Sequence, residues 1–209
     1  MNINVLCHSS IKIESEGKVI YLDPFQIKEE KNDADIIAIT HSHYDHFSEK
    51  DINKIKNKET KIIITNDLLD RTLKLGFNKE DIIVVMPNNL YKVLDIKIET
   101  IPAYNINKKF HPKENNWIGY LITLEKQIIY IAGDTDVTEE NKSVKCDIAL
   151  VPVGGTYTMT HTEAAELVNI IRPAIAIPTH YGEIVGKKED GEKFSNKVDN
   201  NINVEIKIV

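Results

Sequence analysis

Four potential metal ligands lie within the six-residue segment HSHYDH, at positions 41–46 of the sequence. The donors are imidazole nitrogens and a carboxylate, which suit zinc, iron, manganese and nickel, and they come from His41, His43, Asp45 and His46. A loop that follows a strand can turn alternate side chains towards a common point, so His41 and His43 could hold one ion and the other two residues a second. We interpret the segment as a metal-binding loop rather than as a polar surface loop that is rich in histidine.

Two more candidate ligands lie far along the chain, Asp134 in the segment AGDTD and His180 in the segment PTHYG. Each follows an apolar run of strand length, so each is expected at the end of a strand. A carboxylate between two cations can bridge them and offset their repulsion, and Asp134 fits that role. The alternatives are a turn aspartate after Gly133 and a packed or capping histidine at position 180.

Apolar runs and turn residues predict the elements that must position these side chains. The expected strands are 3–6, 11–13, 19–22, 36–40, 62–65, 82–85, 118–124, 128–132, 148–153, 174–178 and 204–208, and the expected helices are 48–56, 67–75, 162–172 and 192–198. Val93, Leu94, Ile96 and Ile98 are expected to lead into a further strand. The order is strands, αβ units, strands, αβ units, with a buried type of strand in each half. This order predicts an α+β fold, a four-layer αββα sandwich, as a single domain over residues 1–209.

The composition excludes several classes of protein. The 209 residues include 26 basic and 32 acidic side chains, and the net charge of −6 argues against a nucleic-acid coat or a polybasic membrane anchor. The hydrophobic fraction of 42% is typical of a globular protein. The start of the chain does not resemble a signal peptide and no apolar run is long enough to span a bilayer, so the expected location is the cytoplasm.

The motifs His41-x-His43-x-Asp45-His46, Gly133-Asp134 and the late His180 resemble those of the metallo-β-lactamase-fold hydrolases. The opening of the chain, with HSS at positions 8–10 and LDPF at positions 22–25, is similar to the branch that contains ascorbate-6-phosphate lactonase-like and N-acylphosphatidylethanolamine phospholipase D-like proteins. The resemblance implies a centre of one or two metal ions at a sheet edge, held by His41, His43, Asp45, His46, Asp134 and His180. Zinc is the expected metal, with manganese and iron as alternatives.

One position departs from the family. In most members a further histidine completes the ligand set of the first ion, and here that position is Asn105. An amide oxygen is a poor ligand for zinc beside imidazole. Two outcomes are open: His111, six residues later, folds back and takes its place, or the first site is weak or empty.

Other polar residues have open roles. His8 and Asp23 each follow a strand and could orient a ligand histidine through its second ring nitrogen, or could be polar residues of the core. His161 is expected to start a helix behind Thr160. The pair of glycines at 154–155 allows a close approach of the backbone or supplies a turn. Three lysines around His111, at positions 108, 109 and 113, are either a cationic lid or a solvated loop.

The function implied by the resemblance is hydrolysis of a small ester, lactone or phosphodiester by metal-bound hydroxide, with Asp45 and Asp134 as catalytic residues. The expected partner is a small molecule, with anionic substrates among the candidates, and neither nucleic acid nor a membrane span is expected. Tyr181 and His111 are candidates for protonating the leaving group. The alternatives are an iron-dependent oxidoreductase, cleavage of a nucleic-acid phosphodiester, and a metal-binding protein without catalysis.

Overall fold

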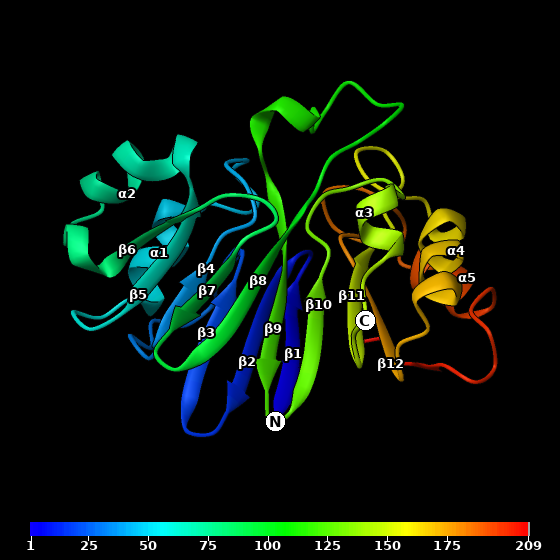
Figure 1. Cartoon of the computed structure of the whole chain (residues 1–209), viewed down its shortest axis with the longest axis horizontal. Coiled ribbons are helices and arrows are strands. Elements are labelled where there is room, and N and C mark those ends of the chain that lie inside the picture. The colour runs from blue at the N-terminus through cyan, green and yellow to red at the C-terminus, as the bar shows by residue number, and fades with distance from the viewer. Residues whose placement is uncertain (209) are drawn as a thin grey trace. The chain divides into compact units, whose positions relative to one another are not determined.

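The computed structural model describes residues 1–208, so Val209, the last residue of the predicted domain 1–209, lies outside the described residues. The chain divides into two compact units, residues 1–86 and residues 87 onward. Each unit is built on one β-sheet with helices (Figure 1). Within the described residues, no helix is both long enough and apolar enough to cross a membrane.

The first unit contains a six-stranded sheet in which the strands follow their order in the sequence. Its elements are β1 (Asn2–Cys7), β2 (Ser10–Ser15), β3 (Lys18–Leu22), β4 (Ile36–Ala38), α1 (Glu49–Ile55), β5 (Lys61–Thr65), η1 (Asn66–Leu68), α2 (Leu69–Lys74), η2 (Lys79–Asp81) and β6 (Ile82–Val85). Strands β1, β2 and β3 form an antiparallel meander, and β3 to β6 are parallel. The carboxyl ends of β3 and β4 therefore meet at the same edge of the sheet.

Helix α1 covers one face of this sheet. Ser48 caps it by accepting a hydrogen bond from the backbone amide of Asp51, which satisfies one of the amides that a helix start leaves unpaired. Its apolar side chains, Ile52 and Ile55, are buried in one cluster with Ile37 of β4 and Ile62 of β5. Because β4 and α1 are packed in the same cluster, both ends of the loop that joins them are held by buried residues.

The second unit contains a seven-stranded sheet in the order β13-β12-β11-β10-β9-β8-β7. Its elements are β7 (Leu90–Val93), β8 (Ile96–Pro102), η3 (Lys113–Asn115), β9 (Ile118–Leu124), β10 (Gln127–Ile131), α3 (Glu139–Lys142), β11 (Ile148–Pro152), α4 (His161–Ile171), β12 (Ile175–Thr179), α5 (Asp190–Ser195) and β13 (Asn203–Val204). Strands β7 to β10 are antiparallel, and β10 to β13 are parallel. The carboxyl ends of β10, β11 and β12 thus lie at one sheet edge.

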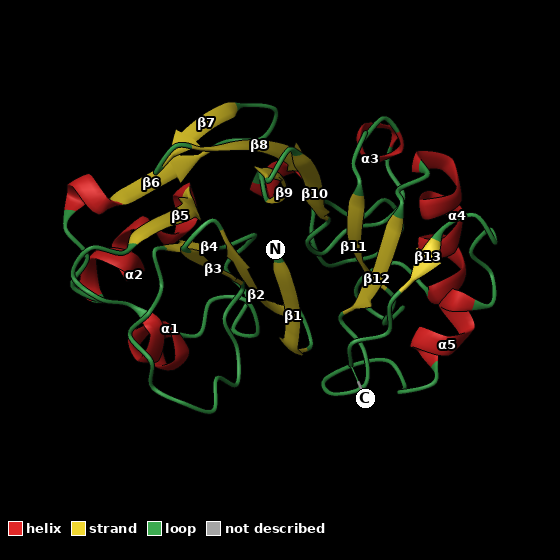
Figure 2. Cartoon of the chain, turned by 90° about the horizontal axis from the view of Figure 1, so that it is seen from below, coloured by secondary structure: helices red, strands yellow, loops and turns green. Residues whose placement is uncertain are grey.

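Helices α4 and α5 lie on the same side of the parallel strands, as Figure 2 shows. Helix α4 starts with a capping box between Thr160 and Glu163. It ends at Ile171, and the capping residue Arg172, which precedes Pro173, has a left-handed conformation. Its apolar side chains share a buried cluster with β11 and β12 that includes Ala149, Val151, Leu167, Val168 and Ala176. This packing fixes the parallel strands whose ends carry polar loops.

Most of the predicted elements are present within a residue or two of their predicted ends. The strand that Val93, Leu94, Ile96 and Ile98 are expected to lead into is present as β8, but Val93 belongs to β7, because Leu94 and Asp95 have φ values of 47° and 68° and form the turn between the two strands. Two left-handed residues in succession are typical of a tight hairpin turn, but this turn lacks the usual Asn-Gly signal. The predicted strand 204–208 is shorter in the structure, and helix α3 was not predicted.

Candidate metal-binding residues

The segment 41–46 follows β4 directly and folds into a compact turn. The backbone amides of His46 and Phe47 both donate to the carbonyl of His43, at 3.1 and 2.8 Å. His41, Asp45 and His46 are buried, whereas His43 is half-buried. The loop therefore holds four potential ligands in fixed positions within the first unit.

A buried network around Asp23 and Thr40 determines which ring nitrogens can bind a metal. One oxygen of Asp23 accepts from the Thr40 amide at 2.8 Å, and the other accepts from the Thr40 hydroxyl at 2.7 Å. That second oxygen also accepts from Nδ1 of His46 at 2.7 Å, and the Thr40 oxygen accepts from Nδ1 of His41 at 2.9 Å. Because both histidines use Nδ1 as a donor, Nε2 of each carries a lone pair and can act as a ligand.

His41 and His43 form one pair of donors. Nε2 of His41 lies 3.0 Å from Nδ1 of His43. Two nitrogens bound to one zinc ion at about 2.1 Å each lie no more than about 4 Å apart. The pair therefore fits a shared ion.

Asp45 and His46 form a second group, together with His8. Oδ2 of Asp45 lies 3.6 Å from Nε2 of His46 and 3.3 Å from Nε2 of His8, and the three donor atoms lie within 4.8 Å of one another. His8 is fully buried in the turn between β1 and β2. From the sequence, His8 was open between an orienting partner of a ligand histidine and a polar residue of the core, and it was not among the predicted ligands.

The second unit has its own cluster, centred on Asp134. One oxygen of Asp134, Oδ2, lies 3.2 Å from Nε2 of His111 and 3.1 Å from Nε2 of His180. All three residues are buried. Asp134 follows β10 and His180 follows β12, at the sheet edge where sequence reasoning expected them. A carboxylate oxygen between two imidazoles is a donor arrangement that fits a metal site.

His111 reaches Asp134 because the loop after β8 folds back on itself. The Asn105 amide group donates to the carbonyls of Phe110 at 2.9 Å and of Tyr157 at 2.7 Å, and its nitrogen lies 3.1 Å from Nδ1 of His111. The Asn105 backbone amide donates to the His111 carbonyl at 2.8 Å. Asn105 thus closes the loop that brings His111 to the position near Asp134.

Gly154 allows the backbone at His180 to approach closely. A Cβ atom at Gly154 would overlap the carbonyl oxygen of His180 and lie 3.4 Å from its Nδ1. Of the two roles left open for this glycine, the close approach is the one present. Any larger residue there would displace His180.

Several residues of the two clusters have an unusual backbone conformation. Asp23, His8, His180 and His111 have φ values of 45°, 53°, 58° and 59°. Few residues other than glycine adopt this region, although asparagine, aspartate and histidine do so more often than the rest, and the chain has it at turns outside the clusters as well. It redirects each side chain relative to the strand or loop before it, and no hydrophobic pattern could have predicted it.

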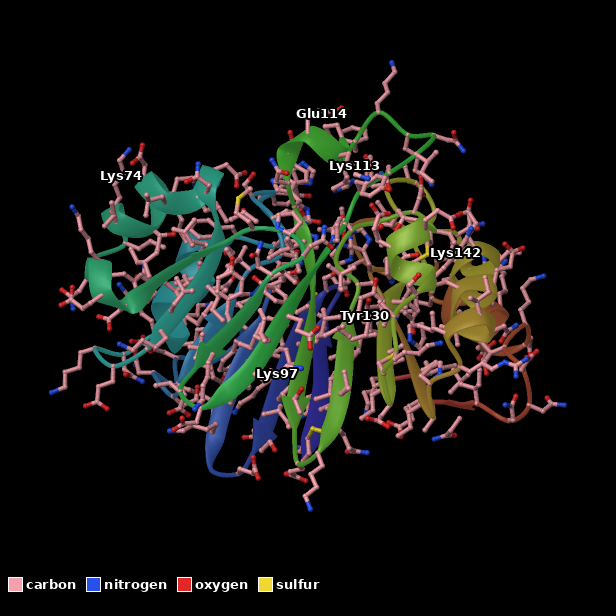
Figure 3. The ribbon with its side chains drawn as sticks, viewed as in Figure 1. Lys74, Lys97, Lys113, Glu114, Tyr130 and Lys142 are labelled. Atoms are coloured by element: carbon pink, nitrogen blue, oxygen red, sulfur yellow. The ribbon has the colours of Figure 1, made fainter. Side chains whose placement is uncertain are left out.

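The lysines near His111 have acidic partners. Lys108 pairs with Asp136, whose carboxylate also accepts the Ile106 amide at 2.9 Å. Lys113, the first residue of η3 and labelled in Figure 3, lies 2.7 Å from a carboxylate oxygen of Glu140. Two of the three positive charges considered for a cationic lid are therefore balanced locally.

Tyr181 follows His180 but is a residue of the hydrophobic core. Its ring is buried with the apolar residues under α4, and its hydroxyl donates to the carbonyl of Ile208 at 3.3 Å. Burial raises the pKa of Tyr181 to about 12. Its hydroxyl therefore has a structural partner, which makes it a poor candidate for protonating a leaving group.

Comparisons with known proteins agree with this chemistry. A model of the β-lactamase superfamily domain matches residues 2–180. The chain is 32% identical over 219 residues to a UPF0173 metal-dependent hydrolase of Methanosphaera stadtmanae, covering 97% of this chain and 93% of the relative. A UPF0173 metal-dependent hydrolase of Aeropyrum pernix is 31% identical over 223 residues, with 94% and 89% covered. A crystal structure of a protein from Parabacteroides distasonis shares 32% identity and a TM-score of 0.82, with 99% and 93% covered. The predicted α+β metallo-β-lactamase fold is thereby confirmed.

Proposed function

Since this chain belongs to the β-lactamase superfamily of metal-dependent hydrolases, we propose that it cleaves a small ester, lactone or phosphodiester with one or two bound metal ions. The observation that carries the proposal is the pair of buried histidine and aspartate clusters, one in each unit, with donor atoms about 3.0 to 3.6 Å apart. The lactonase-like or phospholipase D-like branch stays a prediction.

We assign the ligands by combining the motif order with the local geometry of each unit. His41 and His43 serve the first ion, with His111 in the place that most of the family gives to a histidine at the position of Asn105. Asp45, His46 and His180 serve the second ion. We assign Asp134 to both ions, as the bridging carboxylate that the sequence predicts, and its Oδ2 atom lies 3.2 Å from Nε2 of His111 and 3.1 Å from Nε2 of His180. That the two units act as a single domain over residues 1–209 rests on the motif order in the sequence.

A bound divalent ion supplies a hydroxide nucleophile at neutral pH and polarises the bond to be cleaved. Zinc fits the imidazole and carboxylate donors, and manganese and iron are the alternatives. The chain contributes the orientation of its ligands: Asp23 fixes the ring of His46, and Thr40 fixes the ring of His41. Second partners of this kind make an imidazole a better ligand and hold its orientation.

The loop after β8 supports a small substrate over a polymeric one. Ile106 and Phe110 are exposed on it, and the ring of Phe110 packs edge-on against Tyr157 with centroids 4.7 Å apart. Lys108 and Lys113 are paired with carboxylates, so the loop does not present a strong positive field to nucleic acid. The expected location is the cytoplasm, as predicted from the sequence.

The test is a hydrolysis screen of the full chain after loading with zinc or manganese. Three substrate classes are assayed: nitrophenyl esters, lactones, and bis(nitrophenyl) phosphate. We expect turnover on at least one class, loss of it in His46→Ala, and no change in His161→Ala, because His161 lies at the start of α4 and near Asp190. If the metal-loaded protein turns over none of the three substrate classes, the result would contradict the proposal and favour a metal-binding protein without catalysis.

A further inference from the structure

We propose that His8 is a direct ligand of the ion that Asp45 and His46 bind, so that the first unit alone supplies three protein donors to it. This inference rests on the proposed function, because it concerns the same metal centre. Neither the motif HSHYDH nor the resemblance to the family includes His8 among the ligands.

The position of the His8 ring supports a direct role. Its Nε2 atom lies 3.3 Å from Oδ2 of Asp45, and Nε2 of His46 lies 3.6 Å from the same oxygen. The two rings are edge-on to each other, with centroids 6.4 Å apart. Two imidazoles that present Nε2 to one carboxylate oxygen, all within 4.8 Å, are spaced as donors around a single ion.

The hydrogen bond from His46 to Asp23 leaves the Nε2 atom of His46 available as a ligand. His46 already donates Nδ1–H to Asp23, so its Nε2 presents a lone pair towards Asp45. His8 brings a third nitrogen to the same place, and a divalent cation satisfies all three donors at once.

The turn that carries His8 is held in a costly conformation. His8 has a φ of 53°, a region that glycine and asparagine adopt most readily, and its strain costs roughly 1 kcal/mol or more. The neighbouring Ser10 is buried, and its hydroxyl accepts the backbone amide of Phe25 at 3.2 Å. This bond fastens the turn to the loop that carries Asp23, so the ring of His8 is placed by rigid structure.

The experiment is NMR of the full chain with ¹⁵N-labelled histidine, loaded with ¹¹³Cd²⁺ as the metal probe. A nitrogen bonded to the ion shows a direct scalar coupling to ¹¹³Cd. We expect the Nε2 signal of His8 to show this coupling and to be the signal lost in His8→Asn. Asparagine tolerates the positive φ, so this variant removes the imidazole without adding strain to the turn.

Two further variants keep the result interpretable. His8→Gly removes the backbone strain of the turn together with the imidazole. We expect both His8→Gly and His8→Asn to weaken the binding of the Cd²⁺ ion held by Asp45 and His46 by at least about 10-fold. His161→Asn is the matched control, and we expect it to remove an uncoupled signal and to leave binding unchanged.

The possible failures are distinguishable. If other imidazoles couple to ¹¹³Cd but that of His8 does not, His8 is not a ligand and this inference fails while the proposed function stands. If no imidazole couples, the metal centre is absent and both fail.

Discussion

The two units hold their histidine and aspartate clusters by different means. In the first unit, four of the donors come from six consecutive residues, and the buried pair Asp23 and Thr40 fixes two of the rings. In the second unit, the donors come from three separate segments around Asp134. The first cluster is thus set by a local turn, whereas the second depends on how distant loops are closed.

The loop after β8 in the second unit is closed by Asn105 and brings His111 to Asp134. The resemblance to the family implies a histidine at the position of Asn105, and here the Asn105 side chain donates to the carbonyls of Phe110 in the same loop and of Tyr157 in a distant one. His111 then reaches Asp134 with a φ of 59°. On the proposed ligand assignment, the donor to the first ion lies six residues later than in most of the family, and Asn105 closes the loop that brings it to Asp134.

The largest effect is expected at Asp134, the residue that unites the second cluster. Asp134→Ala removes the oxygen that lies beside both His111 and His180, so metal content falls. Hydrolysis should drop by roughly 1,000-fold or more, which corresponds to about 4 kcal/mol of transition-state stabilisation. Plasma mass spectrometry and kcat/KM on the same preparation check this. Full metal content and activity would exclude the bridging role.

A smaller effect is expected at Asp23, which acts on the first cluster through His46. In Asp23→Asn, an amide N–H that faces His46 would take the place of the oxygen that accepts Nδ1–H, and the proton would move to Nε2, the ligand atom. We expect the affinity for zinc to fall by about 10- to 100-fold in a competition titration.

Asp33→Asn is the control for Asp23. Asp33 accepts from Tyr21 at 2.9 Å and pairs with Lys12 at 3.0 Å, and it belongs to neither cluster. Equal zinc affinities in the two variants would show that Asp23 does not orient His46.

A comparable test addresses the loop of the second unit. Asn105→Ala leaves the carbonyls of Phe110 and Tyr157 without their donors, which should cost about 1 to 3 kcal/mol of stability. His111 should also lose its fixed position, lowering zinc affinity by about 10-fold. Denaturant unfolding and a zinc titration measure the two effects, with the exposed Asn107→Ala as the control in the same loop. If zinc affinity stays unchanged in Asn105→Ala, the position of His111 does not depend on the hydrogen bonds of the Asn105 side chain.

The smallest effect is expected at the pair Lys113 and Glu140. The hydrogen bond from Lys113 is the largest cause that lowers the pKa of Glu140 from 4.5 to about 2. A lowered pKa contributes stability above pH 4.5 that is lost as the pH falls towards 2. Glu140→Gln should therefore lower Tm at pH 7 by no more than about 3 °C, and the difference should narrow below pH 4.5. A difference that grows in acid would contradict this assignment.

The sequence predicted the parts of the molecule that depend on local pattern. Apolar runs located most strands, and the contiguous motif at 41–46 located the first cluster, because residue type and spacing are enough there. His8 and His111 were not assigned as ligands, since each reaches its cluster through a left-handed backbone conformation that residue type does not reveal. The turn at Leu94 and Asp95 escaped prediction for the same reason.

The most direct test of the account is the metal content of four forms of the chain: wild type, His43→Ala, His111→Ala and the double variant. In the proposed ligand assignment, His43 and His111 bind the same ion, the first one. Plasma mass spectrometry after reconstitution with zinc should then find two ions in the wild type and one in each variant, including the double variant. No metal in the double variant would mean that the two histidines bind different ions, and no metal in the wild type would contradict the metal centre itself.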